Sequence, residues 1–191
     1  FGALLLSFAQ RSQADGPARI GLVPIGSPSN LYDLSLVEAF RQGLREVGLA
    51  ENRDVVIDLV WVRDESEYVP VIRDLVQRGA RLLMPAGTSA SVAAKKQTST
   101  LPIVFLTVGD PVGIGLVASL SRPGGNVTGF SDVLLDLSVK YVEFAREVGK
   151  QKDSVDYLWY RGWANGPQRF QSTEQAARSL GVKLRSREIG D

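Results

Sequence analysis

Residues 19–48 read RIGLVPIGSPSNLYDLSLVEAFRQGLREVG, and this stretch decides the fold class. Its first part, 20–25, is a short apolar run of the kind that forms a buried parallel strand. Apolar residues then recur at helical spacing over 36–47. Ser35 and Glu38 have the spacing of a capping box, so we expect a helix to begin near Ser35. The stretch therefore predicts one strand followed by one helix.

The same alternation continues along the rest of the chain. Further strands are predicted at 55–62, 82–86, 103–107, 127–130 and 155–160, and further helices at 71–76, 89–97, 112–120, 137–148 and 170–180. Such alternation is typical of a parallel sheet with helices on both faces, so the predicted class is α/β. The breaker-rich run SRPGGN at 121–126 predicts a domain boundary near 122–133. The pattern stops at Asp191 in mid-alternation, which we interpret as a truncation.

Composition excludes several classes of function. The chain has 22 basic and 21 acidic residues, a net charge of +1, so no global field favours nucleic acid or an acidic membrane. Cysteine and histidine are both absent, which removes thiolate nucleophiles, Ser-His-Asp triads and cysteine or histidine metal sites. We therefore expect no metal, no cofactor and no enzymatic activity. The rival reading is an α/β enzyme that uses carboxylates alone.

The first residues resemble the end of a secretory signal. Residues 1–9 read FGALLLSFA, an apolar run too short to span a bilayer, and 10–17 are polar and rich in breakers. Small residues at Ala9 and at Ala14 each fit a cleavage site. The alternative is a short buried helix or strand at a domain edge. The export reading predicts a soluble periplasmic protein, with no membrane-spanning segment and no lipid on an N-terminal cysteine.

Small polar loops follow three of the predicted strands, at 26–30, 87–89 and 108–111. In open α/β sheets, ligands bind at the carboxyl ends of the strands, so these loops converge on one edge. At Gly87 a ligand can approach the backbone, and Thr88 and Ser89 add hydroxyl groups at a helix N-terminus, which favours a carboxylate or phosphate. The alternative for Thr88 and Ser89 is plain N-capping.

The other two loops carry the same ambiguity. Asp110 could accept a hydrogen bond from a ligand ammonium, or it could cap a helix that begins at Pro111. Ser27, before Pro28, could bind a ligand or serve the turn alone. Nucleotide binding is weakly supported, because neither G-x-G-x-x-G after the first strand nor a Walker A lysine motif occurs.

Two further clusters have structural and functional readings. The carboxylates Asp64, Glu65 and Glu67 precede a helix and predict its solvated first turn. Trp159 is predicted to pack in a core, whereas Tyr160 or Trp163 would stand on a cleft wall in the functional reading.

Taken in order, several stretches resemble the ABC-transporter substrate-binding family that includes the tryptophan/tyrosine-type binding proteins of bacteria. They are RIGL at 19–22, GSP at 26–28, AFRQGLRE at 39–46, GT at 87–88, PIVF at 102–105, VGDPVG at 108–113, GLVASL at 115–120 and RPGGNVTG at 122–129. The resemblance implies a type I periplasmic-binding fold, with two α/β lobes that close on a small molecule and an incomplete second lobe.

The domains expected on this basis are a signal remnant and linker at 1–18, an N-terminal lobe at 19–123, a hinge crossing at 124–133 and a partial second lobe at 134–191. Hinge glycines, which can absorb dihedral change, would be Gly124, Gly125 and Gly129.

The resemblance also implies a site and a function. The ligand-binding residues would be Ser27, Pro28, Gly87, Thr88, Ser89, Asp110 and Pro111. A ligand carboxylate would meet Thr88 and Ser89, and its ammonium would approach Asp110. The expected function is the extracytoplasmic solute-binding component of an ABC importer, which captures a small molecule such as an amino acid, aromatic ones included, and delivers it to a membrane permease. The alternative to transport is the ligand-sensing domain of a receptor.

Overall fold

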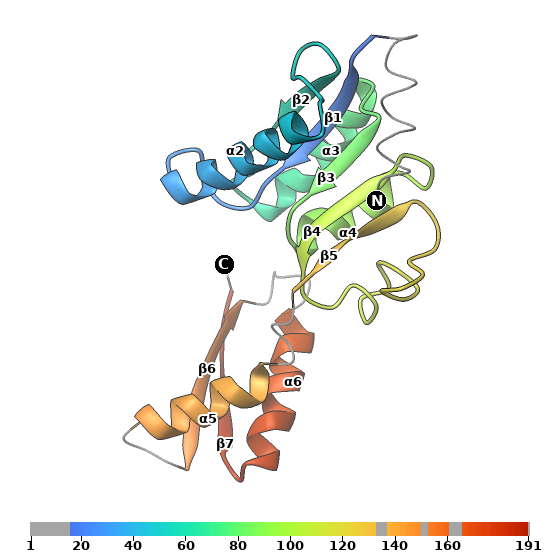
Figure 1. The fold of residues 1–191 in the computed structure, drawn as a ribbon. Coiled ribbons are helices and arrows are strands. Elements are labelled where there is room, and N and C mark those ends of the chain that lie inside the picture. The colour runs from blue at the N-terminus through green and yellow to red at the C-terminus, as the bar shows by residue number, and fades with distance from the viewer. Residues whose placement is uncertain (1–15, 133–136, 150–152, 161–165, 191) are drawn as a thin grey trace.

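The computed structural model describes residues 16–132, 137–149, 153–160 and 166–190. Its elements are β1 (Ala18–Val23), α2 (Leu31–Glu46), β2 (Val55–Leu59), the 3-10 turn η1 (Glu65–Glu67), α3 (Tyr68–Gln77), β3 (Leu82–Pro85), α4 (Thr88–Gln97), β4 (Ile103–Val108), β5 (Val127–Ser131), α5 (Ser138–Val148), β6 (Ser154–Tyr160), α6 (Gly166–Ser179) and β7 (Lys183–Ile189). One parallel sheet has the order β2-β1-β3-β4-β5, and β6 and β7 form a second parallel sheet (Figure 1). The predicted α/β class is therefore confirmed.

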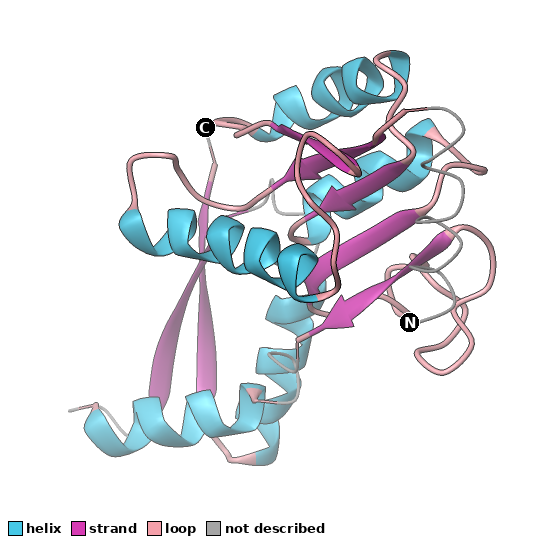
Figure 2. Cartoon of the chain, turned by 45° about the horizontal axis from the view of Figure 1, so that its top comes forward, coloured by secondary structure: helices cyan, strands magenta, loops and turns pink. Residues whose placement is uncertain are grey.

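Helices cover both faces of the five-stranded sheet (Figure 1, Figure 2). On one face, Val37 and Leu44 of α2 pack with Ile20 and Leu22 of β1. On the other face, residues of α3 and α4 join residues of β4 and β5 in a larger core, in which Leu75 is completely buried. Strands buried on both sides need apolar residues throughout, which explains why β1 lacks a polar alternation.

Helix α2 begins one turn earlier than its capping-box spacing predicted. Asn30 is the N-cap residue, with extended backbone, and its side-chain oxygen accepts hydrogen bonds from the Tyr32 and Asp33 amides at 2.8 and 3.4 Å. Ser35 instead donates its hydroxyl to the Tyr32 carbonyl. The prediction was wrong because asparagine is itself a strong N-cap and lies nearer to the end of β1.

The helix predicted over 112–120 is absent, and the segment forms turns. The amides of Leu116 and Val117 both donate to the Pro111 carbonyl, at 2.8 and 3.0 Å, so the chain folds back on itself. Gly115 adopts a φ of +69°, which a right-handed helix does not allow. Leu116 and Val117 are buried nevertheless, which accounts for the apolar periodicity of the sequence.

The second sheet packs against α5 and α6. Val142 of α5 and Ala177 of α6 are buried with Val182 in a small core. The indole of Trp159 stacks on the Phe170 ring with centroids 5.5 Å apart, but Trp159 is half-buried and lies outside this small core, so its predicted core role is not confirmed. Trp163 lies outside the described residues.

The segment predicted as a hinge crossing includes strand β5. This strand pairs in parallel with β4, and the chain leaves the first sheet only after Ser131. Gly124 and Gly125 precede β5, with φ of +69° and +66°. Gly129 lies within β5, where a Cβ would overlap the backbone carbonyl oxygen of Phe105. The domain limits and the hinge role of these glycines stay predictions.

Most of the predicted signal remnant, residues 1–15, lies outside the described residues. Within the described ranges, no helix is both long and apolar enough to cross a bilayer.

Candidate ligand-binding site

A cavity of about 360 Å³ lies at the carboxyl edge of the first sheet. It is lined by Ile25, Glu65, Tyr68, Ala86, Gly87, Thr88, Ser89, Thr107, Gly109, Asp132 and Arg169. Arg169 belongs to α6 of the second lobe, and the other residues belong to the first lobe or to the segment that leaves it. The N-terminal end of α6 lies near the ends of β4 and β5 (Figure 1). The cavity is therefore formed between the two α/β units.

The N-terminus of α4 opens onto this cavity. Gly87 is the N-cap residue, with φ of 83° and ψ of 167°, and no side chain caps the first turn. The Gly87 amide donates to the Leu106 carbonyl at 2.8 Å. Thr88 and Ser89 are helical residues of the first turn and are not its caps. The N-capping alternative is therefore excluded for both, and the amides of the first turn lack the side-chain acceptor that capping normally supplies.

Glu65 and Tyr68 form another wall. Glu65, predicted to be a solvated first-turn residue, accepts a hydrogen bond from the Ser89 hydroxyl at 2.7 Å and lines the cavity. Partial burial raises the pKa of the Tyr68 phenol above its ordinary value of 10.0, and the negative charge of Glu65 raises it further. The phenol is therefore neutral at physiological pH and can donate a hydrogen bond.

Thr107 contributes a strained backbone to the cavity. Its φ is +52°, in the left-handed region that β-branched residues avoid. The β4–β5 register shifts between Phe105 and Val108, so the irregularity is part of the sheet edge. Such strain concentrates at functional sites, and a single sequence carries no signal for it.

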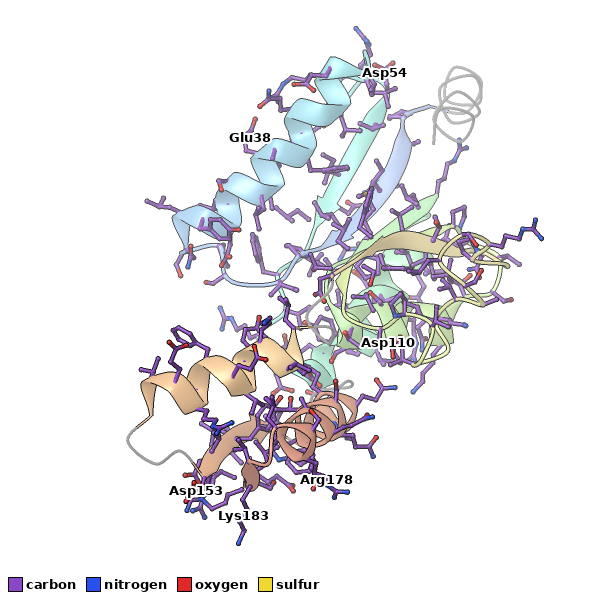
Figure 3. All side chains as sticks on the ribbon, turned by 60° about the horizontal axis from the view of Figure 1, so that its bottom comes forward. Glu38, Asp54, Asp110, Asp153, Arg178 and Lys183 are labelled. Carbon is purple, nitrogen blue, oxygen red and sulfur yellow. The ribbon has the colours of Figure 1, made fainter. Side chains whose placement is uncertain are left out.

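The remaining predicted site residues do not line this cavity. Asp110, in the loop after β4 (Figure 3), accepts a hydrogen bond from the Gly113 amide at 2.8 Å. Ser27 donates its amide to Asp33 and shares a hydroxyl contact of 2.8 Å with Ser29. Pro28 and Pro111 are also absent from the lining. The structure thus brings Gly87, Thr88 and Ser89 together, while ligand contact by the other four stays a prediction.

Sequence reasoning missed Arg169, Glu65, Tyr68, Thr107 and Asp132. Arg169 and Asp132 lie far along the chain from the first loops, and only the packing of α6 near the sheet edge joins them to the site. Glu65 was missed because it directly precedes a helix, and a carboxylate at that position is usually exposed to solvent. Across the described parts of the chain, no group of three or more acidic, histidine or cysteine side chains could hold a metal ion.

Ligand sites occur preferentially between domains, and the cavity lies between two parallel α/β units. The family model for "ABC transporter substrate binding protein" matches residues 22–189. The chain therefore belongs to the ABC transporter substrate-binding protein family. A curated relative, the "Tyrosine-binding protein" of Clostridioides difficile (strain R20291), is 32% identical over 108 residues, which are 56% of this chain and 31% of that protein.

Solved structures give the same fold. An ABC domain of Streptococcus pneumoniae, solved in complex with L-Trp, aligns with a TM-score of 0.76 and 26% identity over 91% of this chain and 58% of that one. A conserved domain protein of Vibrio cholerae aligns with a TM-score of 0.76 and 28% identity over 90% and 57%. The fold is thus of the type I periplasmic-binding kind, and the chain spans less than two thirds of the length of these relatives. The family and its structural neighbours are solute-binding proteins and not enzymes, in agreement with the prediction.

Proposed function

We propose that this chain is the extracytoplasmic solute-binding component of an ABC importer and that it binds a small amino acid-like carboxylate between its lobes. The observation that carries the proposal is the uncapped N-terminus of α4, which opens onto the cavity between the lobes. Ligand pockets of proteins measure about 300 to 1,000 Å³, and the cavity lies in that range. Family membership supports transport, with a membrane permease as the partner.

The ligand carboxylate would be held at the first turn of α4. Amides at a helix N-terminus point outward and carry partial positive charge, so they bind anions without a buried counter-charge. Thr88 adds a hydroxyl group at the same place, whereas the Ser89 hydroxyl donates to Glu65 and holds that carboxylate beside the first turn. A ligand ammonium would face Glu65 or Asp132, the two carboxylates that line the cavity. In this proposal Asp110 supports the loop after β4 through its bond to Gly113.

Binding would favour the closed arrangement of the lobes. A ligand shifts a conformational equilibrium only by its difference in affinity for the two states. A solute that contacts the first turn of α4 and α6 together has that difference, because the contacts come from separate lobes. The closed form would then present the joined lobes to the permease.

Calorimetric titration with L-tyrosine, L-tryptophan and other amino acids tests the proposal. We expect binding to at least one class, weakened about 10-fold or more in S89A and left unchanged in S29A, an exposed serine that does not line the cavity. E65Q, D132N and D110N then distinguish the two carboxylates that line the cavity from the one that the sequence predicted, and weakening in D132N alone assigns the ammonium to Asp132. Weakening in E65Q alone supports Glu65 as the partner of the ammonium, whereas weakening in D110N alone restores the sequence-based assignment. Binding of no amino acid or organic acid would refute the proposal.

A further inference from the structure

Arg169 is the cationic residue of the cavity, and it comes from the second lobe. It lies in the first turn of α6 and also lines a smaller cavity of about 230 Å³ within that lobe. Its backbone carbonyl accepts a hydrogen bond from the Thr173 hydroxyl at 2.8 Å, which holds the turn that carries it. The guanidinium is thereby anchored on a regular helix and not on a loop.

No hydrogen bond or ion pair joins the Arg169 guanidinium to any residue in the described ranges. Other arginines of this chain pair with acids, among them Arg178 of the same helix with Glu174 at 3.1 Å. Glu65, which lines the same cavity, is engaged by the Ser89 hydroxyl. A guanidinium offers five donors in a planar fork that matches a carboxylate. The cavity therefore contains an anion-binding group that the described part of the chain leaves unsatisfied.

We propose that Arg169 is the specificity-determining residue of the site and that it holds the ligand carboxylate from the side of the second lobe. This inference rests on the proposed function and names the chemistry that the site selects. The first turn of α4 supplies partial positive charge, worth about half an elementary charge, whereas Arg169 supplies a full one. Small organic acids are selected over their neutral amides, because an amide loses the charge-assisted pair and presents its own donors to the guanidinium.

The placement of Arg169 also links this recognition to the lobes. The amides of α4 belong to the first lobe, so a carboxylate that meets both groups bridges the two units. A ligand that lacks the carboxylate loses this charge-assisted link between the lobes, so it favours the closed arrangement less.

Calorimetric titration with L-tyrosine and L-tryptophan, each paired with its amide, tests this inference. R169Q removes the charge, and R169K keeps the charge but loses the fork. The matched control is R178Q, in the last turn of the same helix, where the side chain is exposed and pairs with Glu174 (Figure 3). We expect R169Q to weaken binding of the acid by about 10- to 100-fold and of the amide by less than about 2-fold. R169K should fall between the wild type and R169Q, and R178Q should equal the wild type.

Equal weakening of acid and amide in R169Q, or no weakening of either, would overturn the inference. Circular dichroism melting of each variant separates a folding defect from lost recognition. If the wild-type chain melts cooperatively but binds no amino acid or organic acid, the proposed function fails and this inference fails with it. If the wild type binds and S89A weakens binding while R169Q does not, only the assignment of Arg169 is refuted.

Discussion

Replacing Gly87 by alanine tests the backbone geometry that opens α4 to the cavity. Its φ of 83° and ψ of 167° lie in a region that essentially only glycine occupies, where other residues cost about 1–3 kcal/mol. An added Cβ would lie 2.9 Å from Cδ1 of Ile25, but that side chain is 51% exposed and ends in a flexible methyl group, so it can move. Backbone strain therefore destabilises the variant more than this contact does.

The expected destabilisation lowers the melting temperature of a chain of this size by about 2–12 °C. The control is G43A in α2, where φ is helical and nothing lies within 4 Å of the added Cβ. That change replaces a poor helix former by a good one and should raise the melting temperature by about 2–4 °C. Thermal denaturation followed by circular dichroism measures both. A G87A melting temperature equal to that of the wild type would refute the reasoning.

Three other outcomes are expected. L75A should destabilise the chain by about 2–5 kcal/mol in urea denaturation, because Leu75 is 0% exposed and its loss leaves a cavity; a change below about 1 kcal/mol would contradict the assigned core. Hydrogen bonds from Arg185 and Arg187 lower the pKa of the Asp156 carboxyl below its ordinary 3.8. The ionised carboxylate therefore stabilises the folded chain above pH 3.8, and this stabilisation is lost on acidification. D156N should therefore flatten the loss of stability below about pH 4, and an unchanged pH profile would count against the ion pairs. E65Q should lower the pKa of Tyr68 in an NMR titration without returning it to 10.0, because burial raises this pKa more than the charge of Glu65 does. A full return to 10.0 would show that the charge of Glu65 is the larger cause.

The sequence alone was sufficient for the α/β class and for most of its strands and helices, although not for the turns over 112–120. Strand and helix patterns depend on local periodicity, and buried parallel strands such as β1 are apolar on both faces wherever they lie in the sheet. The loop at Gly87 was also predictable, because the carboxyl ends of parallel strands share one edge and a small-residue helix start favours anions. The motifs between 102 and 129 led to the family that the family model then identified.

The tertiary structure decided how the site is completed. Arg169 and Glu65 line one cavity because α6 lies near the sheet edge and Glu65 of η1 reaches Ser89 at the start of α4, and neither arrangement leaves a periodic signal in the sequence. The positive φ of Thr107 lies where the β4–β5 register shifts, and that register depends on pairing between distant segments. The Asp110 carboxylate accepts a hydrogen bond from the Gly113 amide. The sequence left open whether this carboxylate has such a local partner or a ligand. Local periodicity fixes the elements, whereas the charges that face a ligand depend on long-range packing that a single sequence does not encode in any short stretch.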